Sequence, residues 1–239
     1  VVALRGTNDS AQRLRFGARA MAAAGLHIRT EQRSLDAVGH PVTLVPRRDG
    51  DEAVTVVPVP YLDPLRIDEA RGVPRTHDGV IARVVAGALA ACGRPPASCV
   101  VMGHAFANGG AESDSERALT VGGSSLVDLA SFGGAGYVAL GHLHRPQSLA
   151  GGSAWYSGSP LPYSFSEEHA KQVRIVETAG CITSNGVPVD VGRPVRTLTG
   201  TLDDLLSSPA HAAAEGAFLR VRLTDAEHRL GAMEAVQRR

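Results

Sequence analysis

The chain has 239 residues and a mass of 24.9 kDa, enough for one sizeable hydrophobic core and a smaller unit beside it. Its composition is 44% hydrophobic with 27 glycines and 14 prolines, which excludes disordered and collagen-like proteins. Because 24 basic residues balance 24 acidic ones, any binding of nucleic acid has to come from local patches rather than from net charge.

Cysteine content and hydropathy indicate the cellular compartment. The three cysteines, Cys92, Cys99 and Cys181, are odd in number and contain no Cys-x-x-Cys pair, which argues against a disulfide framework or a cysteine zinc site. With no long apolar run and no signal-peptide pattern, we expect a cytoplasmic protein that makes no membrane contact. The chain opens at Val1 inside an apolar run, so we expect a fragment whose beginning is missing.

The first segments predict a strand, a loop and a helix. Residues 1–4 are apolar and rich in valine, which is typical of a strand, and residues 6–10 have the composition of a turn. Residues 11–24 are rich in alanine and predict one helix that stops at Gly25.

A second strand and a second helix follow. Valines repeat through residues 53–59 and predict a strand, which we expect Pro58, Pro60 and Pro64 to break into an extended loop. Residues 76–92 have apolar residues at helical spacing and predict a helix that ends before a Gly-Arg-Pro-Pro stretch.

Two short apolar segments each lead to histidines. Residues 99–102 predict a buried strand that leads to His104, and residues 137–140 predict another that leads to His142 and His144. Strands that alternate with helices predict a layered α/β sheet, in which ligands bind beyond the carboxyl ends of the strands. The histidines therefore lie where chemistry is expected.

The last third of the chain has a different texture. Residues 172–177 and 186–191 predict two strands, and residues 192–194 predict a linker. Residues 218–223 alternate apolar and basic side chains, which predicts a half-exposed strand, and residues 225–239 predict a helix. We expect one domain over residues 1–190 and the beginning of a second, small domain over residues 194–239.

The histidines suggest a metal site. Neutral imidazole is a common ligand of zinc, manganese and iron. A His-x-His pair often occurs without a metal, but His104 at the end of another strand strengthens the hypothesis. The remaining histidines occur in polar or loop-like stretches and are expected to be ordinary surface residues: His27, His40, His77, His169, His211 and His228.

Five ordered motifs carry a resemblance to a known family. They are Gly-Thr-Asn-Asp-Ser at residues 6–10, Phe-Gly at residues 16–17, Gly-His-Ala-Phe at residues 103–106, Gly-His-Leu-His at residues 141–144, and Tyr-Ser-Gly-Ser-Pro-Leu-Pro-Tyr-Ser-Phe-Ser-Glu at residues 156–167. In this order they resemble the bacterial SbcD nucleases, which are calcineurin-like metallophosphoesterases. The twelve-residue motif is the most specific of the five.

The resemblance implies a layered metallophosphoesterase sandwich with an incomplete capping domain, and a site for two metal ions, typically Mn²⁺. In the family such a pair clamps the attacking and leaving oxygens of a phosphodiester. His104 and His142 match the histidines that hold one ion, and His144 matches the histidine that holds the other. Asp9 matches a carboxylate that supports a loop histidine.

Two positions depart from the family pattern. Thr7 stands where the family has an Asn that ligates a metal, and Asn8 stands where it has the catalytic His that assists the leaving group. Because Asn exchanges no proton near neutral pH, acid catalysis worth roughly 10² to 10⁴-fold is expected to be lost. The family's Asp-x-His and Gly-Asp motifs would precede Val1, so we expect an incomplete site and impaired activity.

The implied function is cleavage of DNA as part of a complex. The family works with an SbcC-type ATPase in repair and recombination, as exonuclease on duplex ends and endonuclease on single strands or hairpins, and a homodimer is expected. The metal motifs also fit a small-molecule phosphatase or a cyclic-nucleotide phosphodiesterase. The altered loop at Thr7 and Asn8 also fits an inactive scaffold subunit.

Overall fold

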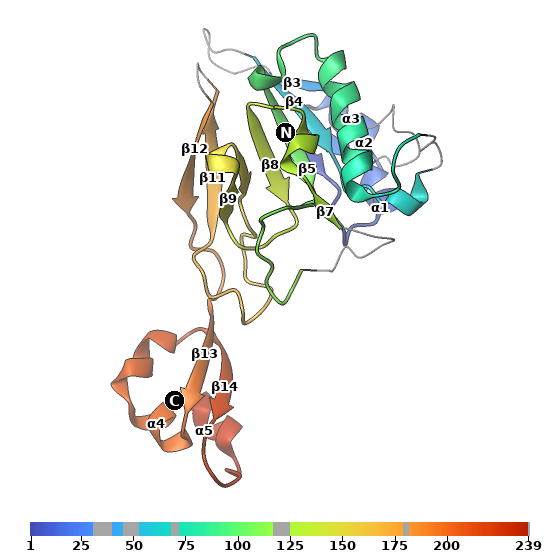
Figure 1. Cartoon of the computed structure of the whole chain (residues 1–239). Helices are drawn as coiled ribbons and strands as arrows, with labels where there is room; N and C mark the ends of the chain where they lie inside the picture. Colours follow the sequence, from blue (N-terminus) through green and yellow to red (C-terminus); the bar gives the residue numbers. More distant parts are fainter. Residues whose placement is uncertain (31–39, 45–52, 68–71, 117–124, 179–181, 239) are drawn as a thin grey trace.

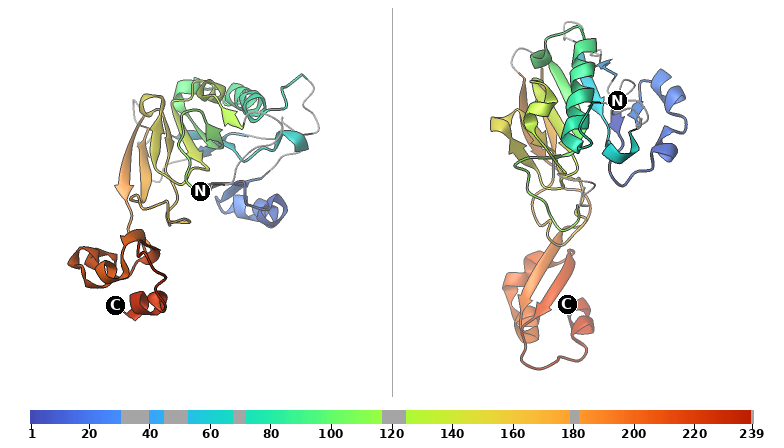
Figure 2. Two further views of the ribbon diagram at one scale, coloured as in Figure 1. Left: turned by 60° about the horizontal axis from the view of Figure 1, so that its bottom comes forward. Right: turned by 45° about the vertical axis from the view of Figure 1, so that its right-hand side comes forward.

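The computed structural model describes residues 1–30, 40–44, 53–67, 72–116, 125–178 and 182–238. These residues form a larger layered α/β part and a smaller C-terminal part, and the chain passes from the first to the second before β13 (Figure 1). Two rotated views show the smaller part attached to one end of the larger one (Figure 2).

A six-stranded sheet forms the centre of the larger part. Its strands in spatial order are β3 (Val42–Leu44), β4 (Val54–Val59), β5 (Cys99–His104), β8 (Tyr137–Gly141), β10 (Ala154–Tyr156) and β9 (Gln147–Leu149). The four central strands are parallel, whereas both edge strands run antiparallel to their neighbours. The predicted layered α/β class is confirmed, and the structure adds that the sheet is rich in parallel strands.

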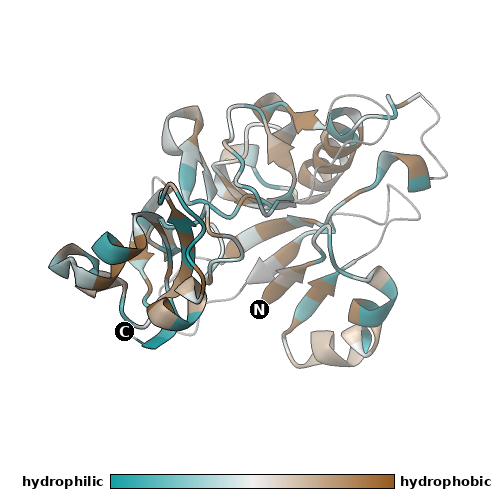
Figure 3. Cartoon of the chain, turned by 90° about the horizontal axis from the view of Figure 1, so that it is seen from below, coloured by the Kyte–Doolittle hydropathy of each residue, from teal (hydrophilic) through white to brown (hydrophobic). Residues whose placement is uncertain are grey.

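Both faces of this sheet are covered, which explains why its strands are nearly continuous apolar runs. Successive residues of a strand point to opposite faces. Val57 and Val101 accordingly belong to a cluster shared with α3 (His77–Ala91), and Val56 and Val100 belong to a second cluster on the other face. In Figure 3 the strands and helices of the larger part show brown, apolar stretches interleaved with teal, polar ones.

The helix α3 begins and ends close to its predicted limits. Thr76 is its N-cap, and the Thr76 side chain accepts a hydrogen bond of 3.0 Å from the Gly79 N–H. Val80 and Val84 are completely buried against the sheet. The break predicted at Pro58 is wrong, because Pro58 lies inside β4. β3 pairs only with residues 54–56 of β4. The N–H group that Pro58 lacks is therefore not needed for hydrogen bonds to β3.

The N-terminal segment forms its own small unit beside the sheet. β1 (Val2–Leu4) and β2 (His27–Arg29) pair in parallel, and α1 (Ala11–Arg15) and α2 (Ala18–Ala23) connect them. The prediction of one helix over residues 11–24 is wrong, because the chain breaks at Gly17 with a φ of +73°. Such a left-handed conformation is open to glycine and interrupts a right-handed helix.

A β-hairpin covers the second face of the sheet. It consists of β11 (Gln172–Glu177), as predicted, and β12 (Thr183–Pro188), which begins earlier than the predicted 186–191. The first residues of β12 are polar, and they pair through backbone groups that an apolar pattern does not reveal. A further short pair, β6 (Phe106–Ala107) and β7 (Leu126–Val127), follows the end of β5.

The smaller part contains β13 (Val195–Gly200), α4 (Leu202–Ser207), β14 (Phe218–Leu223) and α5 (Ala232–Arg238). β14 matches its prediction, but the helix predicted from residue 225 begins only at Ala232. The Asp225 carboxylate instead accepts a 2.8 Å hydrogen bond from the Leu202 N–H and lies 2.9 Å from Arg229, which ties this segment to α4.

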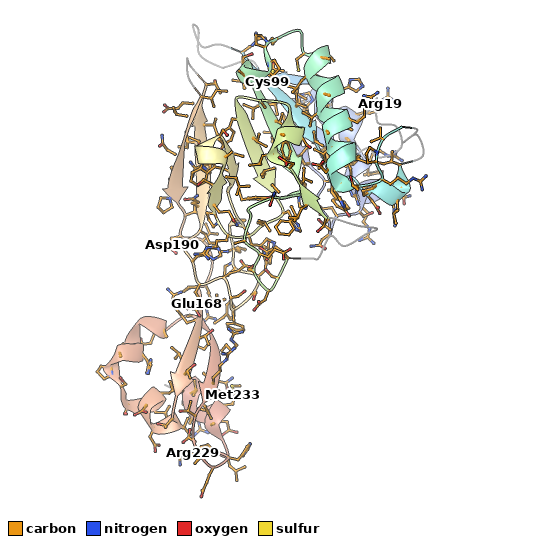
Figure 4. All side chains as sticks on the ribbon, viewed as in Figure 1. Arg19, Cys99, Glu168, Asp190, Arg229 and Met233 are labelled. Carbon is orange, nitrogen blue, oxygen red and sulfur yellow. The ribbon has the colours of Figure 1, made fainter. Side chains whose placement is uncertain are left out.

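Glu168 lies at the junction of the two parts (Figure 4). Its carboxylate accepts a hydrogen bond of 2.7 Å from the Thr197 N–H, and the Arg220 guanidinium lies 5.4 Å from the Phe165 ring centroid. The domain limits 1–190 and 194–239 remain predictions. Across the described ranges, no helix combines the length and the apolar character that a membrane span requires.

Candidate active site

The parallel pairing of β5 and β8 brings the predicted histidines together. In the register of these strands His104, the last residue of β5, lies opposite Gly141, the last residue of β8, and His142 follows directly. Their ring centroids are 5.4 Å apart in an edge-to-face arrangement. The sheet therefore places the two imidazoles at its carboxyl edge, where α/β proteins commonly bind ligands.

His142 has a strained backbone and a free ring nitrogen. Its φ is +115°, a conformation that L-residues rarely adopt and that is often retained at functional sites. The residue is buried, and its Nε2 atom has no hydrogen-bond partner within the described residues. A buried nitrogen without a partner is costly, and a ligand in the pocket would relieve that cost.

Burial keeps both of these histidines neutral. Desolvation, helped by His142, Arg5 and His144, lowers the pKa of His104 to about 3. For His142, desolvation is again the largest cause and lowers the pKa to about 4, although the Glu116 carboxylate acts in the opposite direction. Neutral imidazole is the form that binds metal ions, so both rings are in the required state at pH 7.

The loop after β1 closes over His104. The Thr7 hydroxyl lies 2.8 Å from His104 Nε2, and the Thr7 N–H donates to the same nitrogen at 3.2 Å. A Cβ atom on Gly6 would approach His104 Cε1 to 2.9 Å, so the close packing requires glycine. Asp9 accepts a hydrogen bond of 2.8 Å from the Gly6 N–H and so fixes the loop backbone.

His144 is held by two glutamates that sequence reasoning missed. Glu116 accepts a hydrogen bond of 2.7 Å from the His144 N–H, and the Glu167 carboxylate lies 2.8 Å from His144 Nδ1. The Ser115 hydroxyl bonds both to His144 Nδ1 at 2.8 Å and to Glu167. Glu167 is the last residue of the twelve-residue motif, a signal that could have identified it, whereas Glu116 follows no pattern.

Glu167 is a buried charge with a buried counter-charge. Burial alone would raise its pKa, but hydrogen bonds from Lys171, Ser115 and His144 outweigh that effect and lower the pKa of Glu167 to about 2. Lys171 Nζ lies 2.6 Å from the carboxylate, and both side chains are almost completely shielded from solvent. Glu167 is therefore ionised across the physiological pH range.

The twelve-residue motif holds the histidine loops in place through hydrogen bonds. The Tyr156 hydroxyl donates to the Ala105 carbonyl at 2.7 Å and accepts from the Ala107 N–H at 2.8 Å, which fixes the chain after His104. The Ser159 N–H donates to the His144 carbonyl at 3.0 Å. The Ser159 hydroxyl is occupied by Leu161 and Lys171, consistent with a turn residue rather than a nucleophile.

The residues of the candidate site line one cavity of about 130 Å³. Its lining contains every residue predicted for the site, together with Gly6 and Glu116: Thr7, Asn8, Asp9, His104, His142 and His144. The donor types suit a metal ion, and the lone Nε2 of His142 fits a ligand role. Nevertheless, within the described ranges no three His, Cys, Asp or Glu side chains are arranged as a ready-made metal site, so metal ligation remains a prediction.

His77 is not the surface residue that the sequence suggested. It is buried at the start of α3, its ring centroid lies 5.8 Å from that of Tyr61, and neither ring nitrogen has a hydrogen-bond partner among the described residues. Desolvation lowers the pKa of His77, so the ring is neutral. The polar residues around it in the sequence concealed its burial, which results from packing of the helix start against the loop after β4.

A mixed α/β fold with a parallel-rich central sheet is consistent with the metallophosphoesterase class. No family model matches the chain. The SbcD subunit of the SbcCD nuclease from Rhodobacter capsulatus is 33% identical to it, over 93% of this chain and 61% of that protein. The protein of the same name from Staphylococcus saprophyticus is 28% identical, over 95% of this chain and 59% of that protein. The one from Staphylococcus epidermidis is 35% identical, over 54% of this chain and 35% of that protein.

The chain is therefore an SbcD-like protein, as its motifs predict. It spans about three fifths of the length of two of these relatives.

Proposed function

We propose that this chain takes part in metal-dependent hydrolysis of DNA phosphodiesters, and that the cavity at the carboxyl ends of β5 and β8 is the reacting site. One observation carries the proposal. The loop at residues 6–9 and three histidines that follow two neighbouring strands line a single cavity, in a chain that is SbcD-like over most of its length.

The residues of the cavity have distinct roles in this proposal. His104 and His142 would hold one Mn²⁺ ion, and His144 a second, with Thr7 beside them at the position of the family's Asn. Such an ion pair supplies charge stabilisation to the attacking and leaving oxygens. Neutral imidazoles provide the lone pairs. Nε2 of His142 has no hydrogen-bond partner within the described residues, whereas Nε2 of His104 would first have to release the hydrogen bond that it accepts from the Thr7 N–H. Asn8 at the cavity wall can orient a phosphate oxygen by donating a hydrogen bond, but it cannot transfer a proton.

The wider assignment is also proposed. Relatives carry the name of a subunit of the SbcCD nuclease, which supports an SbcC-like ATPase as partner and DNA as substrate. DNA repair and recombination, a homodimer within the complex and a cytoplasmic location complete the proposal. A different phosphoesterase activity has no observation in its favour.

Binding of Mn²⁺ tests the site directly. The purified chain is titrated with Mn²⁺ and free ion is measured by electron paramagnetic resonance, with His142→Ala as the site variant and the exposed His40→Ala as the matched control. We expect binding by the chain and at least a tenfold weaker affinity in His142→Ala, because a ligand is lost. Absence of binding, or equal affinities in both variants, would refute the proposed site and favour an inactive scaffold.

The loop at Thr7 and Asn8 is tested by cleavage. In a protein extended before Val1 by the family's Asp-x-His and Gly-Asp motifs, Thr7→Asn combined with Asn8→His should raise single-turnover cleavage of single-stranded and duplex DNA in Mn²⁺ by something on the order of 10² to 10⁴-fold, the usual effect of a positioned acid or base. Equal rates before and after the double change would show that Asn8 does not occupy the catalytic position.

A further inference from the structure

We infer that Glu167, with Lys171 as its counter-charge, is the positioning residue that sets the ring orientation and tautomer of His144. The consequence, that Nε2 of His144 is kept free for a metal ion, rests on the proposed function. The tautomer of His144 itself can be measured without any metal.

The contacts of Glu167 define the tautomer. One carboxylate oxygen, Oε1, lies 2.8 Å from His144 Nδ1 and also bonds to the Ser115 hydroxyl. An ionised carboxylate only accepts hydrogen bonds, so Nδ1 has to carry the ring proton. In the neutral ring the second nitrogen, Nε2, then carries no proton, and because His144 lines the cavity that nitrogen is the one available to a ligand there.

Lys171 explains why the carboxylate stays ionised although Glu167 is only 1% exposed. The other carboxylate oxygen, Oε2, lies 2.6 Å from Lys171 Nζ and 3.3 Å from the Ser159 hydroxyl. Lys171 Nζ in turn donates to Ser159 Oγ at 2.9 Å. A buried charge is tolerated only when it is paired and hydrogen-bonded. The two oxygens of Glu167 thus have separate tasks, one toward the cation and one toward the histidine.

The backbone of His144 is fixed by other groups. Its N–H donates to Glu116 at 2.7 Å, and its carbonyl accepts from the Ser159 N–H at 3.0 Å. The position of the residue therefore does not depend on Glu167. The ring orientation and tautomer do, which is the arrangement in which an outer carboxylate tunes a histidine ligand.

The decisive variant is Glu167→Gln, which keeps the shape of the side chain. Lys171 is a donor only, so the new amide oxygen has to face Lys171 and the amide NH₂ has to face His144 Nδ1. Nδ1 must then accept, and the ring proton moves to Nε2. Long-range proton–nitrogen NMR spectra of the ¹⁵N-labelled, metal-free chain report the tautomer, with His144 signals assigned by their loss in His144→Gln.

We expect the Nδ1–H tautomer in the unmodified chain and a shift to the Nε2–H tautomer in Glu167→Gln. Mn²⁺ affinity should fall by about 10 to 100-fold in the same variant, the usual effect of losing an outer carboxylate. The matched control is Glu168→Gln, the same change one residue later. The Glu168 carboxylate bonds to the Thr197 N–H and not to His144, so tautomer and affinity should remain unchanged.

Retention of the Nδ1–H tautomer in a folded Glu167→Gln protein, or an Nε2–H tautomer in the unmodified chain, would overturn the inference. Should Glu167→Gln fail to fold, Glu167→Ala provides the second test. It removes the carboxylate that accepts from Nδ1, so the Nε2–H tautomer should become populated, and a pure Nδ1–H form would count against the inference. If the unmodified chain binds no Mn²⁺, the proposed function fails, while the tautomer comparison still decides the role of Glu167.

Discussion

Removal of one buried hydroxyl group should destabilise the chain measurably. In Tyr156→Phe the ring and its packing remain, but the Ala105 carbonyl and the Ala107 N–H lose their shared partner. Tyr156 is completely buried, so water cannot easily replace the hydroxyl. Each unsatisfied buried group costs about 1–3 kcal/mol, and with partial relaxation we expect the free energy of unfolding to fall by about 2–4 kcal/mol.

Urea unfolding at pH 7, followed by circular dichroism, measures this change. Tyr163→Phe is the matched control, because Tyr163 is 65% exposed and an exposed hydroxyl should change stability by no more than about 0.5 kcal/mol. A loss below about 1 kcal/mol in Tyr156→Phe would refute the reasoning, since it lies under the usual cost of even one unsatisfied buried group. It would mean that the bridge after His104 is not a significant tether of the histidine loop.

Three further predictions concern acid stability, substrate binding and the turn below His144. Because the folded-state pKa values of His104 and His142 lie near 3 and 4, the unfolded chain takes up protons first as the pH falls below about 6.5. The free energy of unfolding should therefore decrease as the pH falls from about 6.5 to about 4. Each histidine contributes at most about 1.4 kcal/mol per pH unit to this decrease. In His104→Gln the free energies of unfolding measured by urea titration at about pH 7 and about pH 5 should differ less than in the unmodified chain. Tyr163→Ala should weaken binding of single-stranded DNA by about 1–3 kcal/mol in a fluorescence titration, because its exposed ring lies 5.1 Å from that of His144 and can stack on a base; unchanged affinity would contradict this. Gly158→Ala should lower stability by more than about 2 kcal/mol in thermal unfolding, because glycine has a φ of +81° there and a Cβ would lie 2.6 Å from the His144 carbonyl oxygen; a neutral effect would show that this turn is not tightly constrained.

Local sequence patterns determined the elements that depend on local chemistry. The valine runs of β4 and β5 predict buried strands because both faces of a parallel sheet are covered. The cap at Thr76 marks the beginning of α3 for the same kind of local reason. Errors arose where a single residue overrides a general tendency, as at Gly17, or where backbone pairing needs no apolar side chain, as in β12.

Some residues of the candidate site were predicted from the sequence, and others were recognised only in the tertiary structure. The strand ends led the sequence analysis to the three histidines, and a resemblance to a known family led it to Thr7, Asn8 and Asp9. Glu116, the role of Glu167 and the burial of His77 were decided only by the tertiary structure, since they depend on contacts between residues far apart in the chain, such as the 28 positions that separate Glu116 from His144. Hydrogen bonds of this kind follow from how loops pack over a sheet, and periodicity along the chain carries no information about them. The strand ends thus determine where the histidines lie, and the packed loops determine which way His144 faces.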